Sequence, residues 1–165
     1  AQTVLKAYAW ILSYGAEGLL EVARTAVLNN NYLAKKLSHV RGISCPYQEN
    51  TTPRLEQIRY SWEALHEETG VGTEDIHDRM QDFGEQTYHT RHHPFIVPEP
   101  FTLEPSETFS KADLDEYAEI FAAISHEAYT DPAVIRSAPH RSAVGHIAPE
   151  AMSSAAVTWQ AHTRK

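Results

Sequence analysis

The sequence has a single cysteine, Cys45, so no disulfide bond can form within the chain. So little cysteine is typical of a reducing compartment, and we expect a cytoplasmic location. Long hydrophobic runs are also missing, since no stretch approaches the roughly 20 apolar residues that a membrane-spanning helix requires. The first residues lack the basic region, apolar core and cleavage site of a secretory signal. We therefore expect no membrane association.

Basic residues are scarce and form no cluster. The 14 lysines and arginines are outnumbered by 22 acidic residues, and the net charge of −8 argues against a nucleic-acid partner. The chain also lacks the G-x-S-x-G nucleophile motif, the P-loop and the dinucleotide-binding fingerprint. What remains is a chain of 165 residues, enough for one compact domain, without a recognisable active site of its own.

Two helices are predicted at the beginning of the chain. Residues 3–14 are apolar on most sides, which is typical of a helix buried between partners, and Gly15 should end it. A second helix should run over residues 17–37, because apolar residues recur on one face with helical spacing. Residues 1–37 are therefore predicted to form a helical connecting segment that packs on another domain.

Three consecutive asparagines, Asn29, Asn30 and Asn31, lie inside the second helix. They are unusual there, because the asparagine side chain competes with the helical backbone for hydrogen bonds. Asn30 falls on the buried stripe. The pattern leaves two explanations open: one satisfied buried amide between two exposed ones, or amides that bond across a contact with another domain or subunit.

The middle of the chain mixes strand and helix patterns. Residues 54–65 alternate between apolar and polar, which predicts a half-buried strand. A loop and a helix should follow, with Thr73 as the N-cap and Gly84 as the end. Residues 110–131 should form a helix that Ser110 caps. The order of elements predicts an α+β domain, a small antiparallel sheet covered by helices, over residues 38–140, and residues 141–165 are expected to be a tail.

Three clusters could carry chemistry. "HTRHH" at 89–93 holds histidines that could line a substrate-facing loop or bind a metal, although its spacing matches no standard zinc site. "LEPSET" at 103–108 places Glu104 and Glu107 just before a helix, where they could act as acid and base or only brace the turn. Arg54 and Arg59 could bind a carboxylate, although exposed arginines are common.

An ordered set of segments resembles the glycine decarboxylase family, the P-protein of the glycine cleavage system. The segments are "GAEGL" at 15–19, "AVLNNNYL" at 26–33, "HEETGVGTEDIHDRMQDFG" at 66–84, "PFIVPEPFTLEPSETFSKADLDEY" at 94–117 and "SAPH" at 137–140. They are similar to the C-terminal part of that family. Asn29 and Asn31 match two family asparagines, and Asn30 stands where the family usually has alanine.

The resemblance implies the C-terminal domain of a fold type I pyridoxal-phosphate enzyme, preceded by a long connecting helix. In that family, glycine forms an external aldimine, and its aminomethyl group passes to a lipoyl carrier protein; the enzyme of this chain is expected to act on glycine or another amino acid. The cofactor lysine follows a histidine, and none of the lysines here has that context. The resemblance therefore implies a large subunit that holds the cofactor, and this chain is expected to be a separate small subunit.

The resemblance also suggests roles for particular residues. The substrate-pocket candidates are Arg91, His92, His93, Arg54, Glu104 and Glu107. The partner-interface candidates are Tyr8, Trp10, Asn29, Asn30 and Asn31, with the asparagines bonding across the junction. No metal site is expected.

The sequence departs from the family in two places. Leu55 stands where the family has a histidine, and residues 84–94 lack the family's Pro-Thr pair. These changes fit a divergent enzyme that acts on another amino acid. They also fit a non-catalytic regulatory or scaffold subunit, and a histidine-based metal-binding module is the third alternative.

Overall fold

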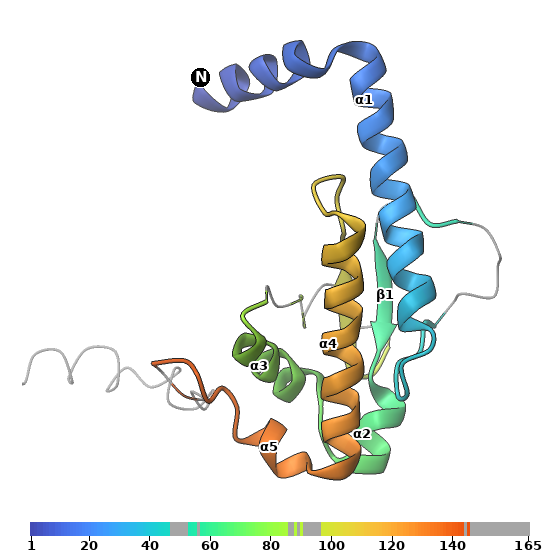
Figure 1. The fold of residues 1–165 in the computed structure, drawn as a ribbon, viewed down its shortest axis with the longest axis vertical. Coiled ribbons are helices and arrows are strands. Elements are labelled where there is room, and N and C mark those ends of the chain that lie inside the picture. Colours follow the sequence, from blue (N-terminus) through green and yellow to red (C-terminus); the bar gives the residue numbers. More distant parts are fainter. Residues whose placement is uncertain are drawn as a thin grey trace, which may run out of the picture.

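The structure is a computed structural model, and it describes residues 1–46, 53–55, 57–85, 88, 90, 97–143 and 145. Its elements are α1 (Gln2–Leu37), β1 (Ile58–Ser61), α2 (Glu63–Thr69), α3 (Thr73–Phe83), β2 (Pro100–Leu103), α4 (Lys111–Thr130) and α5 (Pro132–Arg136). The second half of α1 runs beside the sheet and α4, while α2, α3 and α5 surround the other end of α4 (Figure 1). This arrangement confirms the predicted α+β class.

Gly15 divides α1 into two helices, as the sequence predicts. Its backbone angles are φ 64° and ψ −175°, a conformation that residues with a side chain rarely adopt. We call residues 2–14 the N-terminal arm and residues 16–37 the asparagine helix. The arm bends away at Gly15 and projects from the rest of the molecule, toward the side on which α3 lies (Figure 1).

The described residues form one small antiparallel sheet. Ile58 in β1 lies opposite Leu103 in β2, and Tyr60 lies opposite Phe101. The rings of Tyr60 and Phe101 stack at a centroid distance of 5.0 Å. Cross-strand pairs of this kind are a main source of sheet stability.

The strand predicted over residues 54–65 is too long, because α2 already begins at Glu63. Two hydrogen bonds turn the chain at this point. The backbone N–H of Trp62 donates to the carbonyl oxygen of Glu99 at 3.0 Å, and the N–H of Glu63 donates to Ser61 Oγ at 3.1 Å. The alternating pattern is real, but a contact with a distant residue ends the strand.

The core lies between the asparagine helix, the sheet and α4. Trp62, Phe101 and Phe121 are fully buried. Trp62 stacks on both phenylalanine rings, which are tilted to each other, and the three centroid distances are 5.2 to 5.8 Å. Leu33 and Leu37 of the asparagine helix complete this core. Because stacked rings bury large apolar areas in a fixed geometry, the core gives the surrounding loops a rigid base.

Two of the predicted helix ends are confirmed. Ser110 caps α4: its hydroxyl accepts from the N–H of Asp113 at 3.2 Å, and the Asp113 carboxylate accepts from the N–H of Ser110 at 2.7 Å. Gly84 ends α3 with a left-handed φ of 81°.

The predicted N-cap of α3 is wrong by one residue. Gly72 is the N-cap, and its N–H donates to the carboxylate of Asp75 at 2.9 Å. Thr73 is instead the first helical residue, and its hydroxyl donates to the carbonyl of Pro100 at 3.1 Å. Thr73 therefore ties α3 to β2. Among the helices described, none is long and apolar enough to cross a membrane.

Candidate functional site

Asn29 fastens the asparagine helix to the loop between β2 and α4. Its side-chain amide donates to the carbonyl oxygens of Ser106 and Phe109, at 2.8 and 2.9 Å. The asparagine is buried. The carbonyl of Ser106 also accepts a longer bond, at 3.5 Å, from the backbone N–H of Phe109. Asn29 thus supplies two hydrogen-bond donors to an irregular loop, whose carbonyls would be costly to leave unpaired.

Asn31 fastens the same helix to Arg54. Its amide nitrogen donates to the carbonyl of Arg54 at 2.8 Å, and its amide oxygen accepts from the N–H of Arg54 at 2.9 Å. The nitrogen also donates to the carbonyl of Val27 within the helix at 2.7 Å. The side chain thus pairs with both backbone groups of one residue.

Asn30 differs from both neighbours. It is 1% exposed, and neither its amide nitrogen nor its amide oxygen has a hydrogen-bond partner in the described structure. The expectation of one satisfied amide between two exposed ones is therefore wrong: the two flanking amides are satisfied. Asn29 and Asn31 make these bonds inside the chain, not across a junction with another subunit.

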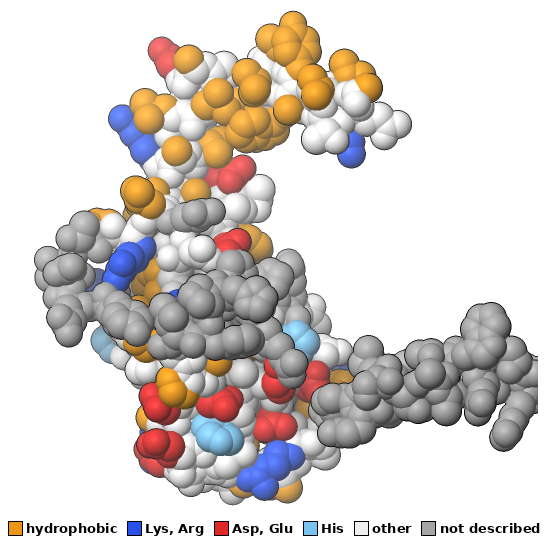
Figure 2. Space-filling view, turned by 180° about the vertical axis from the view of Figure 1, so that it is seen from behind, with side chains coloured by type: hydrophobic (Ala, Val, Ile, Leu, Met, Phe, Trp, Pro, Cys, Tyr) orange, Lys and Arg blue, Asp and Glu red, His pale blue; other side chains and the backbone are white. Residues whose placement is uncertain are grey.

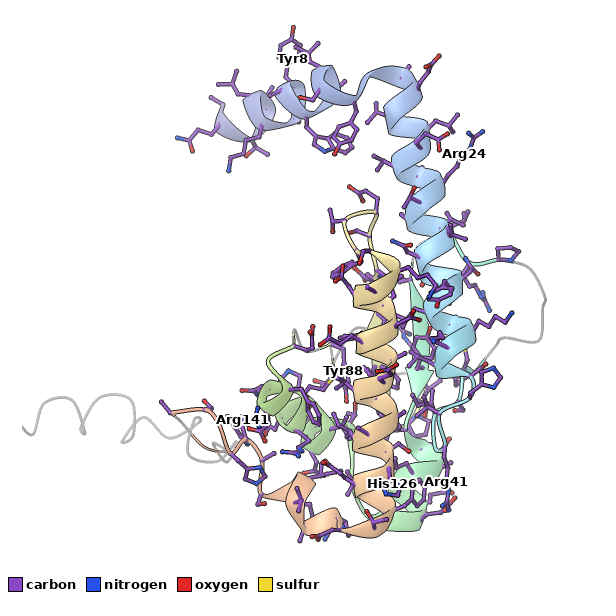
Figure 3. All side chains as sticks on the ribbon, viewed as in Figure 1. Tyr8, Arg24, Arg41, Tyr88, His126 and Arg141 are labelled. Carbon is purple, nitrogen blue, oxygen red and sulfur yellow. The ribbon has the colours of Figure 1, made fainter. Side chains whose placement is uncertain are left out.

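A cavity of about 230 Å³, which we call the Glu104 cavity, opens beside this loop. Glu85 and Glu104 give it negative charge, and no ion pair joins either of them to another described residue. Burial raises the pKa values of Tyr88 and Tyr117, so both phenols stay neutral. Tyr88 lies between α3 and α4 (Figure 3). The lining residues are Leu33, Glu85, Tyr88, Thr102, Leu103, Glu104, Pro105, Phe109, Asp113, Leu114 and Tyr117.

A second cavity, of about 220 Å³, lies beside Cys45, and we call it the Cys45 cavity. Arg54 and Arg59 line it. Burial raises the pKa of the Cys45 thiol, although the charge of Arg54 opposes this, so the thiol is a poor nucleophile. Its Sγ donates to the carbonyl of Arg59 at 3.7 Å. The lining residues are Cys45, Pro46, Arg54, Gln57, Ile58, Arg59 and Thr102, and Thr102 also lines the Glu104 cavity.

The structure separates the predicted substrate-pocket residues. Arg54 lines the Cys45 cavity, whereas Glu104 lines the Glu104 cavity. Glu107 is partly buried in the same loop as Glu104 but lines neither cavity. Arg91, His92 and His93 lie outside the described residues. In the segments described, no group of three or more His, Cys, Asp or Glu side chains could hold a metal ion.

The N-terminal arm exposes large apolar side chains. Figure 2 shows them gathered along it, and Tyr8 lies on the side that faces away from the rest of the domain (Figure 3). Tyr8 is 60% exposed and Trp10 is 43% exposed. The other large apolar residues exposed on the arm are Val4, Leu5, Ile11, Leu12 and Tyr14. Exposed apolar patches of this kind are typical of surfaces that contact another protein, a membrane or a ligand.

Sequence reasoning missed a buried ion network at the end of α3. The Asp82 carboxylate accepts from Arg79 at 2.8 Å and from the backbone N–H groups of His140 and Arg141 at 2.6 and 2.7 Å. Burial disfavours the charge of Asp82, but these hydrogen bonds outweigh that cost and hold its pKa below the usual value. Arg79 also pairs with Glu127 of α4 at 2.9 Å. The network fixes the end of the "SAPH" segment to α3. Arg141, the next residue, lies near α3 (Figure 3).

The described lysines do not fit the role of a lysine that binds pyridoxal phosphate. Lys36 and Lys111 both pair with the carboxylate of Asp115. Lys6 and Lys35 are exposed on α1, and none of the four lines either cavity. None of these four lysines is therefore placed as an attachment point for the cofactor.

Comparison with known proteins identifies the family. Residues 22–142 match the family described as "Glycine dehydrogenase, C-terminal domain". The chain is 43% identical over 144 residues to the "Probable glycine dehydrogenase (decarboxylating) subunit 2" of Pyrococcus horikoshii, and 40% identical to the protein of the same name from Thermotoga maritima. Each match covers 87% of this chain but only 28% or 29% of the relative.

Two solved structures share the fold. A glycine decarboxylase (P-protein) of the glycine cleavage system, in inhibitor-bound form, aligns with a TM-score of 0.56 and 18% identity over 70% of this chain and 24% of its own. Mouse CSAD aligns with a TM-score of 0.58 and 14% identity over 73% of this chain and 26% of its own. The family match and the identity to its relatives together show that this chain belongs to the glycine dehydrogenase C-terminal domain family.

Proposed function

We propose that this chain is the C-terminal domain of a pyridoxal-phosphate-dependent glycine dehydrogenase, and that it works only together with a large domain that holds the cofactor. The observation that carries the proposal is the N-terminal arm, where apolar side chains such as Tyr8 and Leu12 are 60% and 64% exposed. Family membership supports it. When bound, the cofactor supplies an electron sink for bonds at the α-carbon of an amino acid.

The arm and the asparagine helix, residues 1–37, form the segment that packs on the large domain. The bend at Gly15 directs the arm away from the core, so its apolar faces find no cover within the described chain. Burying such a surface contributes about 25 cal/mol per Å². Tyr8 and Trp10 are the anchors of this interface, because large aromatic side chains dominate binding energy at interfaces.

The two cavities are this chain's contribution to the substrate side of the site. The Glu104 cavity combines apolar walls with the carboxylates of Glu85 and Glu104, and the Cys45 cavity carries Arg54 and Arg59. An arginine can bind the carboxylate of an amino acid through two parallel hydrogen bonds. We propose that Arg91, His92 and His93 line the entrance to this substrate site. The proposed substrate is glycine or another amino acid.

The large domain has two candidate origins. It is a separate large subunit, as we expected from the resemblance, or it is further sequence of one longer chain. The curated relatives that match here extend well beyond the matched region, since the match covers 28% of the Pyrococcus horikoshii protein. In both arrangements, a lysine outside these 165 residues binds the cofactor, and a lipoyl carrier protein is a further partner.

The test is co-expression with a candidate large domain, followed by native mass spectrometry and a visible absorption spectrum. We expect a stable complex with the absorption band of lysine-bound pyridoxal phosphate, and release of carbon dioxide from glycine. Peptide mapping of the reduced complex locates the cofactor lysine on a separate chain or on a longer form of this one. A folded monomer that binds no large domain would contradict the proposal.

A second function, a non-catalytic regulatory or scaffold subunit, has one observation in its favour. Leu55 stands where the resembled family has a histidine, and its side chain is 80% exposed. A complex that forms with the large domain but releases no carbon dioxide from glycine or from other amino acids would favour this function.

A further inference from the structure

We propose that Asn29 and Asn31 are positioning residues, which hold the walls of the two cavities in place against the asparagine helix. Asn29 holds the loop that carries Glu104, and Asn31 holds the segment that carries Arg54. The inference rests on the proposed function in one respect, because it takes both cavities to face the substrate.

The hydrogen bonds of Asn29 join the two sides of the Glu104 cavity. Glu104, Pro105 and Phe109 form the loop side of its lining, while Leu33 lines it from the asparagine helix. Asn29 lies one turn before Leu33 on that helix, and its amide binds the loop at the carbonyls of Ser106 and Phe109. The two hydrogen bonds therefore set the distance between the two sides of the cavity.

The contacts of Asn31 reach the other cavity. Arg54 lines the Cys45 cavity, and Asn31 binds both its N–H and its carbonyl, so the backbone of Arg54 can neither shift nor rotate without breaking a bond. Thr102 lies between the two sites, because it lines both cavities. One helix thus holds two segments that flank the same strand residue.

The chemistry of each contact requires an amide. Asn29 uses two donor hydrogens, and aspartate at this position would have none to give and would repel both carbonyls. Aspartate in place of Asn31 would lose the donor bonds to the carbonyls of Arg54 and Val27, but it would keep the bond from the N–H of Arg54. The same substitution is therefore expected to loosen the loop held by Asn29 more than the segment held by Asn31, because that segment keeps one of its two bonds to the helix.

Hydrogen exchange of the full chain tests the proposal. We expect Asn29→Asp to speed the exchange of backbone amides in residues 103–110 at least about tenfold and to leave residues 53–58 unchanged. Asn31→Asp should speed exchange at 53–58, by a smaller factor, and leave 103–110 unchanged. Asn30→Ala is the matched control, because Asn30 has no bond to lose, and it should change neither segment.

The buried interior of α4 provides the internal reference. If Asn29→Asp also speeds exchange there, the variant unfolds globally, and the milder Asn29→Ala and Asn31→Ala replace the aspartates. Local opening that is confined to the matching loop in each case supports the proposal. Equal changes in both loops, or in neither, would overturn it.

Kinetics of the assembled enzyme separate positioning from folding. We expect Asn29→Ala to raise the KM for the amino acid at least about tenfold relative to Asn30→Ala, with a smaller effect on kcat. The double variant Asn29→Ala/Glu104→Ala should be no worse than Glu104→Ala alone. Unchanged kinetics beside faster loop exchange would reduce the asparagines to a structural role. A complex without turnover in any form would refute the proposed function, while the exchange result would still decide whether the asparagines hold the loops.

Discussion

At the residue scale, Asn30 is the side chain whose chemistry fits its surroundings least. A buried polar group without a partner costs about 1–3 kcal/mol, and alanine is also the better helix former by several tenths of a kcal/mol. We therefore predict that Asn30→Ala raises the free energy of unfolding by about 1 kcal/mol, as measured by urea denaturation.

Asn31→Ala, which loses the pairing with Arg54, should lower the free energy of unfolding by about 1–3 kcal/mol. Equal losses in both variants would mean that Asn30 has a partner in solution.

Asp82 predicts a specific dependence of stability on pH. Its pKa in the folded chain lies below the ordinary value of 3.8, so its carboxylate stabilises the fold above that pH. This contribution is lost as the pH falls from 3.8 toward the lower folded value. We expect Asp82→Asn to lose about 2–3 kcal/mol at neutral pH, and the gap to wild type to shrink in urea titrations near about pH 3.

Asp78 offers a control for this experiment on the same face of α3. Its side chain is more exposed than that of Asp82, at 21% against 3%, and it contacts the neighbouring His77 and accepts from Gln81. Asp78→Asn should cost less than about 1 kcal/mol at neutral pH. A pH dependence of equal size in the two variants would show that the ion network at Asp82 is not its source.

At the element scale, the bend at Gly15 decides where the arm points. Alanine would be strained at φ 64° and ψ −175°, by about 1–3 kcal/mol, whereas it favours a continuous helix. We predict that Gly15→Ala straightens α1. Circular dichroism should then show equal or greater helix content, while native mass spectrometry should show at least about tenfold weaker assembly with the large domain.

Gly84 is the matched control for this substitution. Both glycines have a positive φ, and neither would bring an added methyl group within 4 Å of another atom. Gly84 ends α3, far along the chain from the arm, so Gly84→Ala should lower stability by about 1 kcal/mol without weakening assembly. Equal weakening in both variants would assign the effect to stability alone.

The boundaries of elements divide into those that the sequence predicts and those that it does not. Gly15 and Ser110 act through their own backbone or a neighbour three residues away, so local patterns predict them. The start of α2 depends on Glu99, and the partners of Asn29 lie 77 and 80 residues along the chain. No local pattern encodes such pairings.

The candidate site shows the same limit. The sequence singles out Arg54 and Glu104, and both line cavities. It also groups them as one pocket, whereas the fold places them in two cavities. Asp82 was missed because a lone aspartate near the end of an exposed-looking helix gives no sign of the network that the "SAPH" segment completes.

At the scale of the whole molecule, the arm forms one apolar surface that no other part of the described chain covers. We predict that Tyr8→Glu/Leu12→Glu leaves the thermal midpoint of the isolated chain unchanged within about 1 °C, because both side chains are at least 60% exposed. The same variant should abolish assembly with the large domain in native mass spectrometry, because a charge buried in an apolar interface is costly. Glu116→Ala/Glu119→Ala, two exposed positions on α4 outside residues 1–37, serves as the control and should assemble normally. Normal assembly of the doubly charged variant would show that the arm is not the docking surface.

The uninterrupted helix between Gly15 and Asn29 has a consequence for how the length of this segment can vary. Each residue of an α-helix advances it by about 1.5 Å and turns it by about 100°. One inserted residue would therefore rotate the arm by about 100° around the axis of the asparagine helix, while the bend and the asparagine contacts stay intact. Seven inserted residues would restore its heading to within about 20°, at a displacement of about 10 Å. The number of residues between Gly15 and Asn29 therefore determines the direction in which the arm points from the domain.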